Sequence, residues 1–411
     1  MAFGLLVTFA AVMFIAPGEW FPELAPLRIA LVTSSLASGL MFFSRLGRRE
    51  PIFFDGIRGW ALIGFAAWTA ASSAWSLHPE NTLLVAIDCV KYVAIYLTIV
   101  NLVTTPKRLQ ALALAMVVGA IFTARGGISH YLAGINLVEG YRAGWVGTYA
   151  DPNRMSMSLQ FIVPIAAAFL LRKQMPLLVK IVAALAGVLC VVAIVFSHSR
   201  GSFIGLAFSM VLWVLLSEKK ANRFAVMGLA AIALVIFAPK TFWNRTGSVS
   251  DFRTDAAAMG RVHAWSVASR ISLDKPLLGV GAGSFRVAWP LYAPHEAVVA
   301  YEAHNVFLQV LAELGIFGFL LFLTFLGASL EGAWKGRNDP DSGWLARALL
   351  AASAGYLVCN LSAGFLGSSP HFYVLFGLAS AAERVARART STALAPTPAA
   401  PRGFQTTPSM G

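Results

Sequence analysis

Charged residues are scarce in this chain: Asp, Glu, Lys and Arg together make up 12% of its 411 residues, whereas soluble domains carry about 25%. Apolar residues make up 58% of the chain, and the mean hydropathy is +0.70. These values exclude a soluble globular protein. They also exclude a soluble nucleic-acid binder, even though the formal net charge is +13, because a basic balance is partly expected of a membrane protein.

Cysteine is also rare, with three residues, Cys89, Cys190 and Cys359, all inside apolar segments. We expect them to pack as small core residues, since they cannot form a disulfide framework. The N-terminal stretch lacks a basic segment and a small-residue cleavage site. Residues 2–16 therefore predict a first membrane helix and not a signal peptide.

Long apolar runs recur almost from end to end, which predicts an all-α polytopic membrane bundle. A porin-type barrel is excluded, because its strands alternate apolar and polar residues over about ten positions. We place about twelve transmembrane helices, at residues 2–16, 26–44, 58–77, 82–103, 108–127, 154–171, 176–196, 201–217, 222–238, 304–331, 342–366 and 370–387.

The basic residues predict the orientation of the bundle. With the N-terminus in the cytoplasm, many Lys and Arg fall on inward connections and both termini lie inside; these inward residues include Arg48, Arg49, Arg172, Lys173 and Arg223. Residues 1–387 form the predicted membrane domain, and 388–411, rich in Ala, Pro and Thr, a disordered cytoplasmic tail. Two long connections, 128–153 and 239–303, face outward, and the second is expected to contain short helices.

The outward connections and nearby helix ends break the charge rule, because they hold nine Arg against two Lys: Arg125, Arg142, Arg154, Arg200, Arg245, Arg253, Arg261, Arg270 and Arg286, with Lys240 and Lys275. Arginine offers a planar fork that binds phosphate or carboxylate, so this cluster indicates an anion site. The alternative is that single Arg residues anchor helix ends at lipid headgroups. A metal site is disfavoured, since no HxxxH or HxH spacing occurs.

One run at the outer start of the span 304–331 is the most informative. His304 and Asn305 are followed after nine residues by Gly315 and then by Gly318. On one continuous helix, the two glycines would lie within about 40° of His304, and Gly315 about 16 Å deeper. We expect the glycines to admit a neighbouring helix and His304 to accept a proton from a hydroxyl near neutral pH. The alternative is an interfacial His above ordinary glycine packing.

Two further short runs carry arginine. Ser199, Arg200 and Gly201 form a turn at the start of an outward-facing helix, where free N–H groups, the helix dipole and a guanidinium can hold phosphate; a plain helical-hairpin turn would look similar. Arg261 and Trp265 are spaced to share a face of a short helix. Trp265 either stacks on a sugar ring or lies in the interface belt.

Two further segments contain proline or glycine at positions that affect the backbone. Before the span 154–171, Pro152 can start the helix and Asn153 can hydrogen-bond its first turn. Gly279, Gly281 and Gly283 do not form a nucleotide loop, because no strand precedes them. Glu313 receives no role from the sequence.

Five short runs together resemble the O-antigen ligase and polymerase superfamily of bacterial inner-membrane glycosyltransferases. They are His304-Asn305 with Gly315 and Gly318, Ser199-Arg200-Gly201, Gly260-Arg261 with Trp265, Gly279-x-Gly281 and Asp151-Pro152-Asn153. The resemblance covers residues 140–320. It implies a GT-C-like bundle that works on the periplasmic face without metal, nucleotide or other cofactor. Its implied partners are undecaprenyl-pyrophosphate-linked O-antigen as donor, lipid A-core as acceptor, and membrane lipids.

Within this resemblance, we expect Arg200 and Arg261 to clamp the donor diphosphate and His304 to activate the acceptor hydroxyl, as the catalytic residues. The expected substrate-binding residues are Arg142, Asn153, His263, Trp265 and Asn305. An O-antigen polymerase and an O-linked oligosaccharyltransferase with a protein acceptor remain alternatives that use the same donor. A polysaccharide transporter is disfavoured, because the polar groups gather on one surface and no internal repeat is visible.

Overall fold

The computed structural model describes residues 1–218, 220, 223–224, 227–228, 256–294, 299–362 and 369–393. In this part of the chain the regular elements are all helices, which confirms the all-α prediction. Seven segments are long and apolar enough to cross a membrane: Ala2–Trp20, Pro22–Gly47, Pro79–Leu102, Pro106–Ala133, Pro152–Leu171, Leu177–Phe196 and Val306–Gly336. The predicted span 222–238 lies almost entirely outside the described residues, as do Lys240, Arg245 and Arg253.

The long helices follow the apolar runs, and their ends follow local chemistry. They are α1 (Ala2–Ile15), α3 (Ile29–Gly47), α5 (Pro79–Leu102), α6 (Pro106–Ala133) and α9 (Leu177–Phe196), with the short α2 (Pro17–Trp20) and η1 (Pro22–Leu27) between the first two. Pro106 occupies the first turn of α6, where its missing N–H costs nothing. Gly134, with φ of 67°, ends α6 in the left-handed conformation.

Four further predicted spans are helices of other lengths: α4 (Gly56–Ala71), α10 (Arg200–Leu215), α16 (Gly343–Asn360) and α17 (Pro370–Ala393). A helix of 16 residues, such as α4 or α10, rises about 24 Å, less than the roughly 30 Å of a bilayer core. The total of twelve crossings therefore stays a prediction. α17 ends at Ala393, and the rest of the predicted tail, 394–411, lies outside the described residues.

The predicted span 154–171 corresponds to the candidate membrane segment Pro152–Leu171, which contains a break. The structure has α7 (Pro152–Gln160) and α8 (Ile162–Leu171), separated at Phe161. The cause is Pro164, which lacks an N–H and whose ring would clash with the carbonyl group of Gln160, four residues earlier. The break ends α7 after nine residues.

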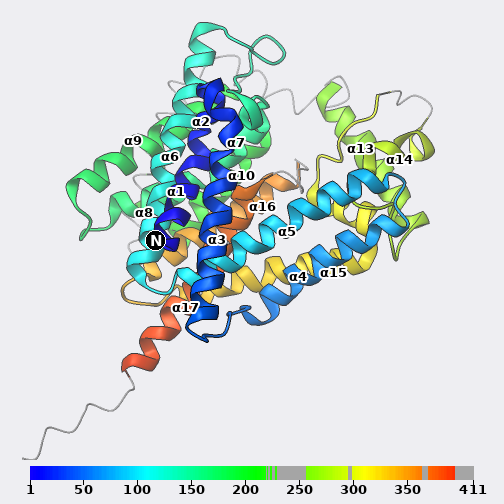
Figure 1. Cartoon of the computed structure of the whole chain (residues 1–411). Helices are drawn as coiled ribbons and strands as arrows, with labels where there is room; N and C mark the ends of the chain where they lie inside the picture. The colour runs from blue at the N-terminus through cyan, green and yellow to red at the C-terminus, as the bar shows by residue number, and fades with distance from the viewer. Residues whose placement is uncertain are drawn as a thin grey trace, which may run out of the picture.

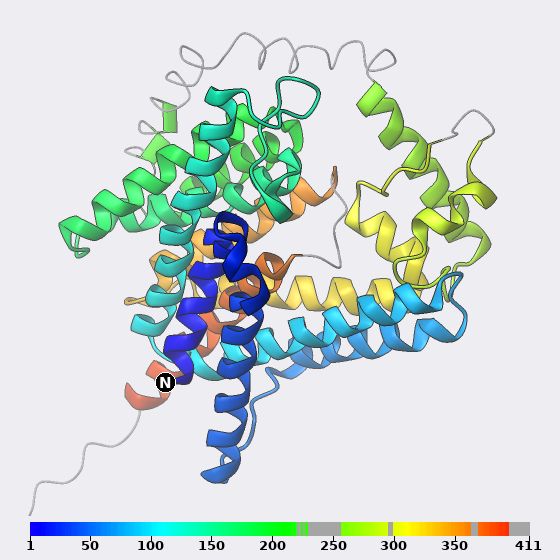
Figure 2. The same cartoon turned by 45° about the horizontal axis from the view of Figure 1, so that its top comes forward.

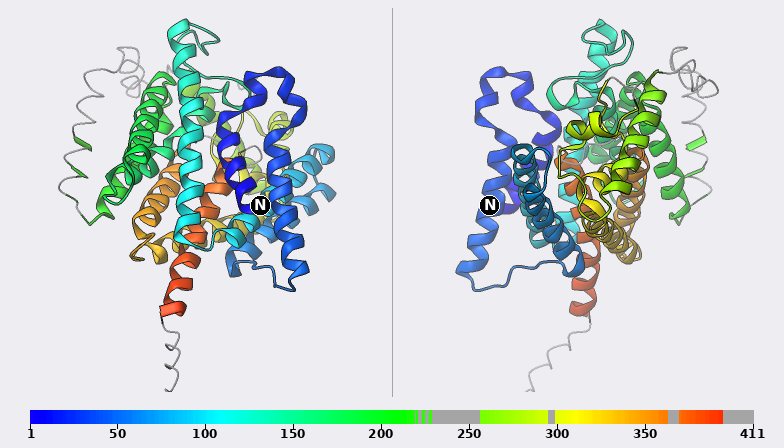
Figure 3. Two further views of the ribbon diagram at one scale, coloured as in Figure 1. Left: turned by 60° about the vertical axis from the view of Figure 1, so that its left-hand side comes forward. Right: turned by 90° about the vertical axis from the view of Figure 1, so that its right-hand side faces the viewer.

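The arrangement of the helices separates two regions (Figure 1). α1 packs between α3 and α6, while α9 packs against α6 and α8. On the other side of the molecule, α13 (Ala256–Asp274) and α14 (Phe285–Tyr292) lie over one end of α15 (Val306–Gly336), beside the ends of α4 and α5 (Figure 2). The described part of the predicted loop 239–303 thus contains two helices, α13 and α14. α17 packs against α5 and α15, and its C-terminal end extends beyond the bundle (Figure 3).

Candidate functional site

His304 precedes α15 and does not lie on it, so the expected helical face shared by His304, Gly315 and Gly318 is wrong. α15 begins at Val306, and Asn305 is its N-cap, with its side-chain oxygen accepting from the N–H groups of Phe307 (3.0 Å) and Leu308 (3.1 Å). His304 itself has φ of 47°. The cap holds Asn305 in a structural contact, and its expected role in substrate binding stays a prediction.

Gly315 interrupts α15 with φ of 64° and ψ of −168°, a conformation that is essentially restricted to glycine. A Cβ atom there would lie 2.1 Å from the carbonyl oxygen of Leu277, and the next N–H, of Ile316, donates to the carbonyl oxygen of Pro276 (2.9 Å). Gly315 therefore admits a loop and not a helix. Gly318 does face a helix, because its Cβ would lie 3.0 Å from the ring of Trp68 on α4.

Glu313, which had no expected role, fixes the glycine-rich loop to α15. Its carboxylate accepts from the backbone N–H groups of Gly283 (2.9 Å) and Phe285 (3.2 Å), and it is buried. Gly279, Gly281 and Gly283 all have positive φ. The signal in the sequence was an acid inside an apolar run, downstream of a Gly-x-Gly-x-Gly segment. The consequence is that the start of α14 and the break in α15 form one rigid junction.

The imidazole of His304 lies among charges from two other elements. Burial, and after it the positive charge of Arg261 on α13, lower the pKa of His304 to about 4, while Asp151 before α7 acts in the opposite direction. At neutral pH the ring is uncharged and has a free lone pair for a proton or a hydrogen bond. The structure thus brings the predicted pair Arg261 and His304 together and adds Asp151, which the sequence did not single out as a site residue.

Arg261 also lines a small recess at the N-termini of α7 and α10. The other lining residues are Asn153, Met157, Ser199, Gly201, Ser202, Cys359 and Ser362. The first N–H groups of a helix have no intrahelical partners, and the dipole favours negative charge there. At α7 two of these N–H groups already donate to Asp151, so it is the start of α10 beside the guanidinium of Arg261 that favours negative charge. In the described ranges, no three His, Cys, Asp or Glu side chains are grouped to hold a metal ion.

Arg200 is the first residue of α10 and stands between two residues that line this recess, Ser199 and Gly201. Close packing fixes this end of α10. A Cβ on Gly201 would lie 2.0 Å from the hydroxyl oxygen of Ser362, and the hydroxyls of Ser156 and Ser202 are 2.7 Å apart. The position of Arg200 at the start of α10 is therefore set by tight contacts to α7 and to the residues after α16.

Arg142 is buried and joins the loops before α7 and α10. Its guanidinium donates to the carbonyl oxygen of Ser197 (3.2 Å) and to the side-chain oxygens of Glu139 (3.1 Å) and Asn153 (2.8 Å). Asn153 therefore does not cap α7 as expected. The cap is Asp151, which accepts from the N–H groups of Asn153 (2.8 Å) and Arg154 (2.9 Å). These contacts give Arg142 a positioning role, and its direct contact with substrate stays a prediction.

His263 and Trp265 both lie on α13, which confirms a helix over the Arg261 run. Neither lines the recess. His263 is two residues from Arg261 and so faces a different side of the helix. The Trp265 Nε1 atom is buried, and no described residue accepts its hydrogen. The expected substrate contacts of both residues stay predictions.

An apolar cavity of about 420 Å³ lies beside α1 and α3, and Tyr149, Thr148 and His371 form part of its wall. Thr148 and His371 also line a narrower hollow with Met157, and Met157 in turn lines the recess at Arg261. Each hollow thus shares wall residues with the next. The Tyr149 hydroxyl bonds the His371 Nε2 atom (2.7 Å) where the first two meet.

The chain is similar to known proteins of polysaccharide biosynthesis. Residues 185–323 match the family model described as O-Antigen ligase, a segment that contains Arg200, Arg261 and His304. A Bacillus subtilis (strain 168) protein named teichuronic acid biosynthesis protein TuaE is 25% identical over 214 residues, which are 48% of this chain and 44% of that protein. A Rickettsia felis protein named as a polysaccharide ligase is 24% identical over 293 residues, 68% of this chain and 69% of the relative. The expected resemblance is therefore confirmed: residues 185–323 carry the domain of the O-antigen ligase family.

Proposed function

We propose that this protein is a membrane glycosyltransferase that moves O-antigen glycan from undecaprenyl pyrophosphate to lipid A-core. In this proposal the reaction takes place on the periplasmic face of the bacterial inner membrane, both termini are cytoplasmic, and no cofactor takes part. The family of residues 185–323 supports a polysaccharide ligase. The observation that carries the proposal is the placing of Arg261 beside both His304 and the N-termini of α7 and α10.

The proposed chemistry needs only a base and an anion site. An acceptor hydroxyl oxygen attacks the anomeric carbon of the donor sugar and gives its proton to the neutral His304. The bond between that carbon and the diphosphate oxygen breaks, and the lipid diphosphate leaves with the electron pair. Arg261, Arg200 and the helix N–H groups stabilise the charge that develops on the leaving group. Attack opposite the leaving group inverts the anomeric configuration.

Donor binding would also tune the base. In the free protein the charge of Arg261 contributes to the low pKa of His304. A diphosphate bound at Arg261 would offset that charge and raise the pKa of His304 towards its ordinary range. The imidazole would then become a stronger base when the donor is in place.

The apolar cavity supports a lipid-linked donor. It lies beside α1 and α3 and suits part of a polyprenyl chain. A polymerase or an O-linked oligosaccharyltransferase would use the same donor site, so only the acceptor separates these activities. A transporter is less well supported, because Arg261 and His304 lie outside the spans and not at their middle.

The test is reconstitution of the purified protein in lipid vesicles with an undecaprenyl-pyrophosphate-linked glycan and lipid A-core. Glycan on lipid A-core, separated by gel electrophoresis, would support the ligase. Longer lipid-linked chains would assign a polymerase, and transfer to an added protein acceptor an oligosaccharyltransferase. An unchanged donor in all three assays would contradict the proposal.

A further inference from the structure

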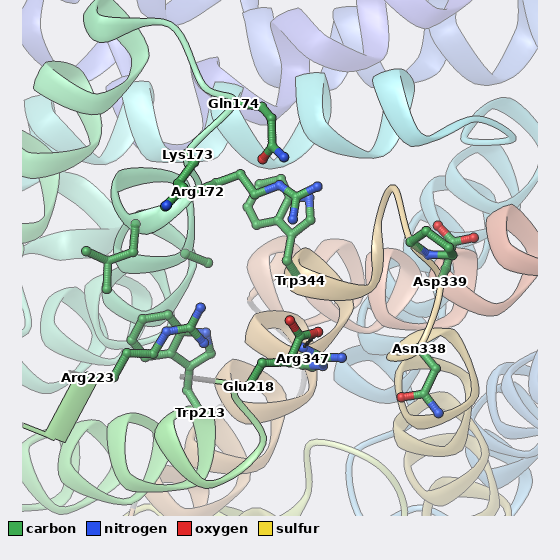
Figure 4. Close-up of a pocket in the computed structure, with 13 residues that line it drawn as sticks. Arg172, Lys173, Gln174, Trp213, Glu218, Arg223, Asn338, Asp339, Trp344 and Arg347 are labelled. Atoms are coloured by element: carbon green, nitrogen blue, oxygen red, sulfur yellow. Dashed lines mark hydrogen bonds and ion pairs between the residues drawn. The ribbon is translucent and has the colours of Figure 1, made fainter. Parts of the chain in front are cut away.

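A second, strongly basic cavity lies at the opposite end of α10 and α16 from the Arg261 recess. It has a volume of about 300 Å³ and lies at the end of α8, the end of α10 and the start of α16 (Figure 4). α10 begins at the recess with Arg200 and reaches the second cavity with Trp213. The two cavities therefore belong to opposite faces of the bundle.

Four cations from separate parts of the chain line the cavity: Arg172, Lys173, Arg223 and Arg347. Two carboxylates, of Glu218 and Asp339, also line it, so the cations are in excess. Arg347 donates to Glu218 at 2.7 Å. Among the described residues, no ion pair joins Arg172, Lys173 or Arg223 to a carboxylate, and the four cations exceed the two carboxylates of the lining by two charges.

Two of the arginines lie over tryptophan rings. The guanidinium carbon of Arg223 is 4.9 Å from the ring centroid of Trp213, and that of Arg172 is 5.8 Å from the ring centroid of Trp344. Figure 4 shows each arginine beside its tryptophan. Stacking on an aromatic face orients the planar guanidinium and leaves its N–H groups at the edge available. The arginines are thus arranged for directed hydrogen bonds and not only for charge.

We propose that this cavity binds the phosphate headgroup of an anionic membrane phospholipid. Arginine forks match phosphate oxygens, and basic pockets between membrane helices are suited to such headgroups. Ala168, Leu171 and the tryptophan rings supply apolar wall for the start of the acyl chains. The first turn of α9, which follows Gln174 of the cavity wall in the chain, exposes Leu177 and Leu178, an apolar surface suited to contact with lipid. The positive-inside rule explains basic residues on one face, but it does not require guanidiniums stacked around one hollow.

This proposal is independent of the glycosyl transfer, because it concerns the other face and uses a binding assay. The full-length protein in a zwitterionic detergent is titrated with dioleoyl phosphatidylglycerol, dioleoyl phosphatidylcholine or sodium phosphate, and the melting temperature is recorded. A ligand that binds only the folded state raises the melting temperature. We expect phosphatidylglycerol to raise it, and phosphatidylcholine and inorganic phosphate to have little effect.

The variants test the cavity itself. The double variant Arg172→Gln with Arg223→Gln is expected to weaken phosphatidylglycerol binding about tenfold or more. A tenfold loss corresponds to about one charge-assisted hydrogen bond, so it is the smallest effect expected when both guanidiniums are removed. The charge-matched control, Arg48→Gln with Arg49→Gln, removes two exposed cations outside the cavity and is expected to bind like the parent chain. If the Gln pair does not fold, Arg172→Lys with Arg223→Lys keeps the charge, removes the forks and is expected to show an intermediate loss.

Three results would overturn the proposal. One is an equal shift with phosphatidylglycerol in the parent chain and in the cavity variants. Another is an equal loss in the control variant, which would mean diffuse surface charge. The third is a full shift with inorganic phosphate alone, which would assign the cavity to a free anion and not to a lipid.

Discussion

Burial and, after it, the nearby charge of Arg261 hold the pKa of His304 at about 4, although the two residues come from different elements. Arg261 is on α13, and His304 stands before the N-cap of α15. The hydrogen bonds of Glu313 to the loop before α14 help to keep these elements together. The site is therefore a junction of α7, α10, α13 and the start of α15.

Replacing Arg261 by Ala is expected to lower the transfer rate by about 10²–10³-fold, the usual loss for one donor to a developing anion. Arg261→Lys keeps the charge but not the fork, and it should recover part of the rate. The rate is measured in reconstituted vesicles with the lipid-linked glycan.

The matched control for this prediction is Arg270→Ala, which changes another arginine of α13. Arg270 is exposed and donates to the carbonyl oxygen of Tyr292 (3.0 Å), away from the recess. It should transfer glycan at nearly the parent rate. An equal loss in both variants would show that α13 had been disturbed as a whole.

Removing the charge of Arg261 should raise the pKa of His304. The imidazole is neutral above its pKa, and its pKa lies below the ordinary value of about 6.5. Arg261→Gln takes away one cause of the lowering and leaves burial in place, so the shift should be upward but incomplete. Histidine-labelled protein is titrated by NMR, and His304→Gln identifies the signal. A pKa that stays at about 4 in Arg261→Gln would contradict the coupling.

A side chain at Gly315 should destabilise the fold. Gly315→Ala forces alanine into a region with φ of 64° and places its Cβ 2.1 Å from the carbonyl oxygen of Leu277. The strain alone lowers the free energy of unfolding by about 1–3 kcal/mol, and the clash adds to it. Gly327→Ala on the same helix is the control, because a Cβ there meets nothing within 4 Å. Equal melting temperatures for the two variants would be incompatible with the break at Gly315.

Removing the carboxylate of Glu313 should open the junction between the glycine-rich loop and α15. Glu313→Ala leaves the N–H groups of Gly283 and Phe285 without their acceptor, at a cost of about 1–3 kcal/mol each. Hydrogen exchange at these two amides should become faster, while exchange in α9, far from the junction, stays the same. Glu313→Gln keeps one acceptor oxygen, so its exchange rates at these amides should lie between those of the parent chain and of Glu313→Ala. Unchanged exchange at both amides in Glu313→Ala would show that the carboxylate does not hold the loop.

The sequence by itself determined the helical class of the fold, and it named the candidate site residues. An apolar run about as long as a membrane is thick must form its backbone hydrogen bonds internally, so the predicted span 176–196 and the observed α9 (Leu177–Phe196) nearly coincide. The choice of Arg261 and His304 followed from residue chemistry and from the spacing of a known family. The helices and these candidate residues can be read from short stretches of the sequence.

Only the tertiary structure decided how these residues meet. The residues from His304 onward have a helical pattern, yet α15 begins only at Val306. The helix then breaks at Gly315, because the loop at Leu277 approaches there. Asn153 was expected to bond its own helix, but Arg142 binds it instead. Burial, close approach and charge pairing depend on residues far apart along the chain. Hydropathy and helix periodicity describe neighbours in sequence, and so they could not place these contacts.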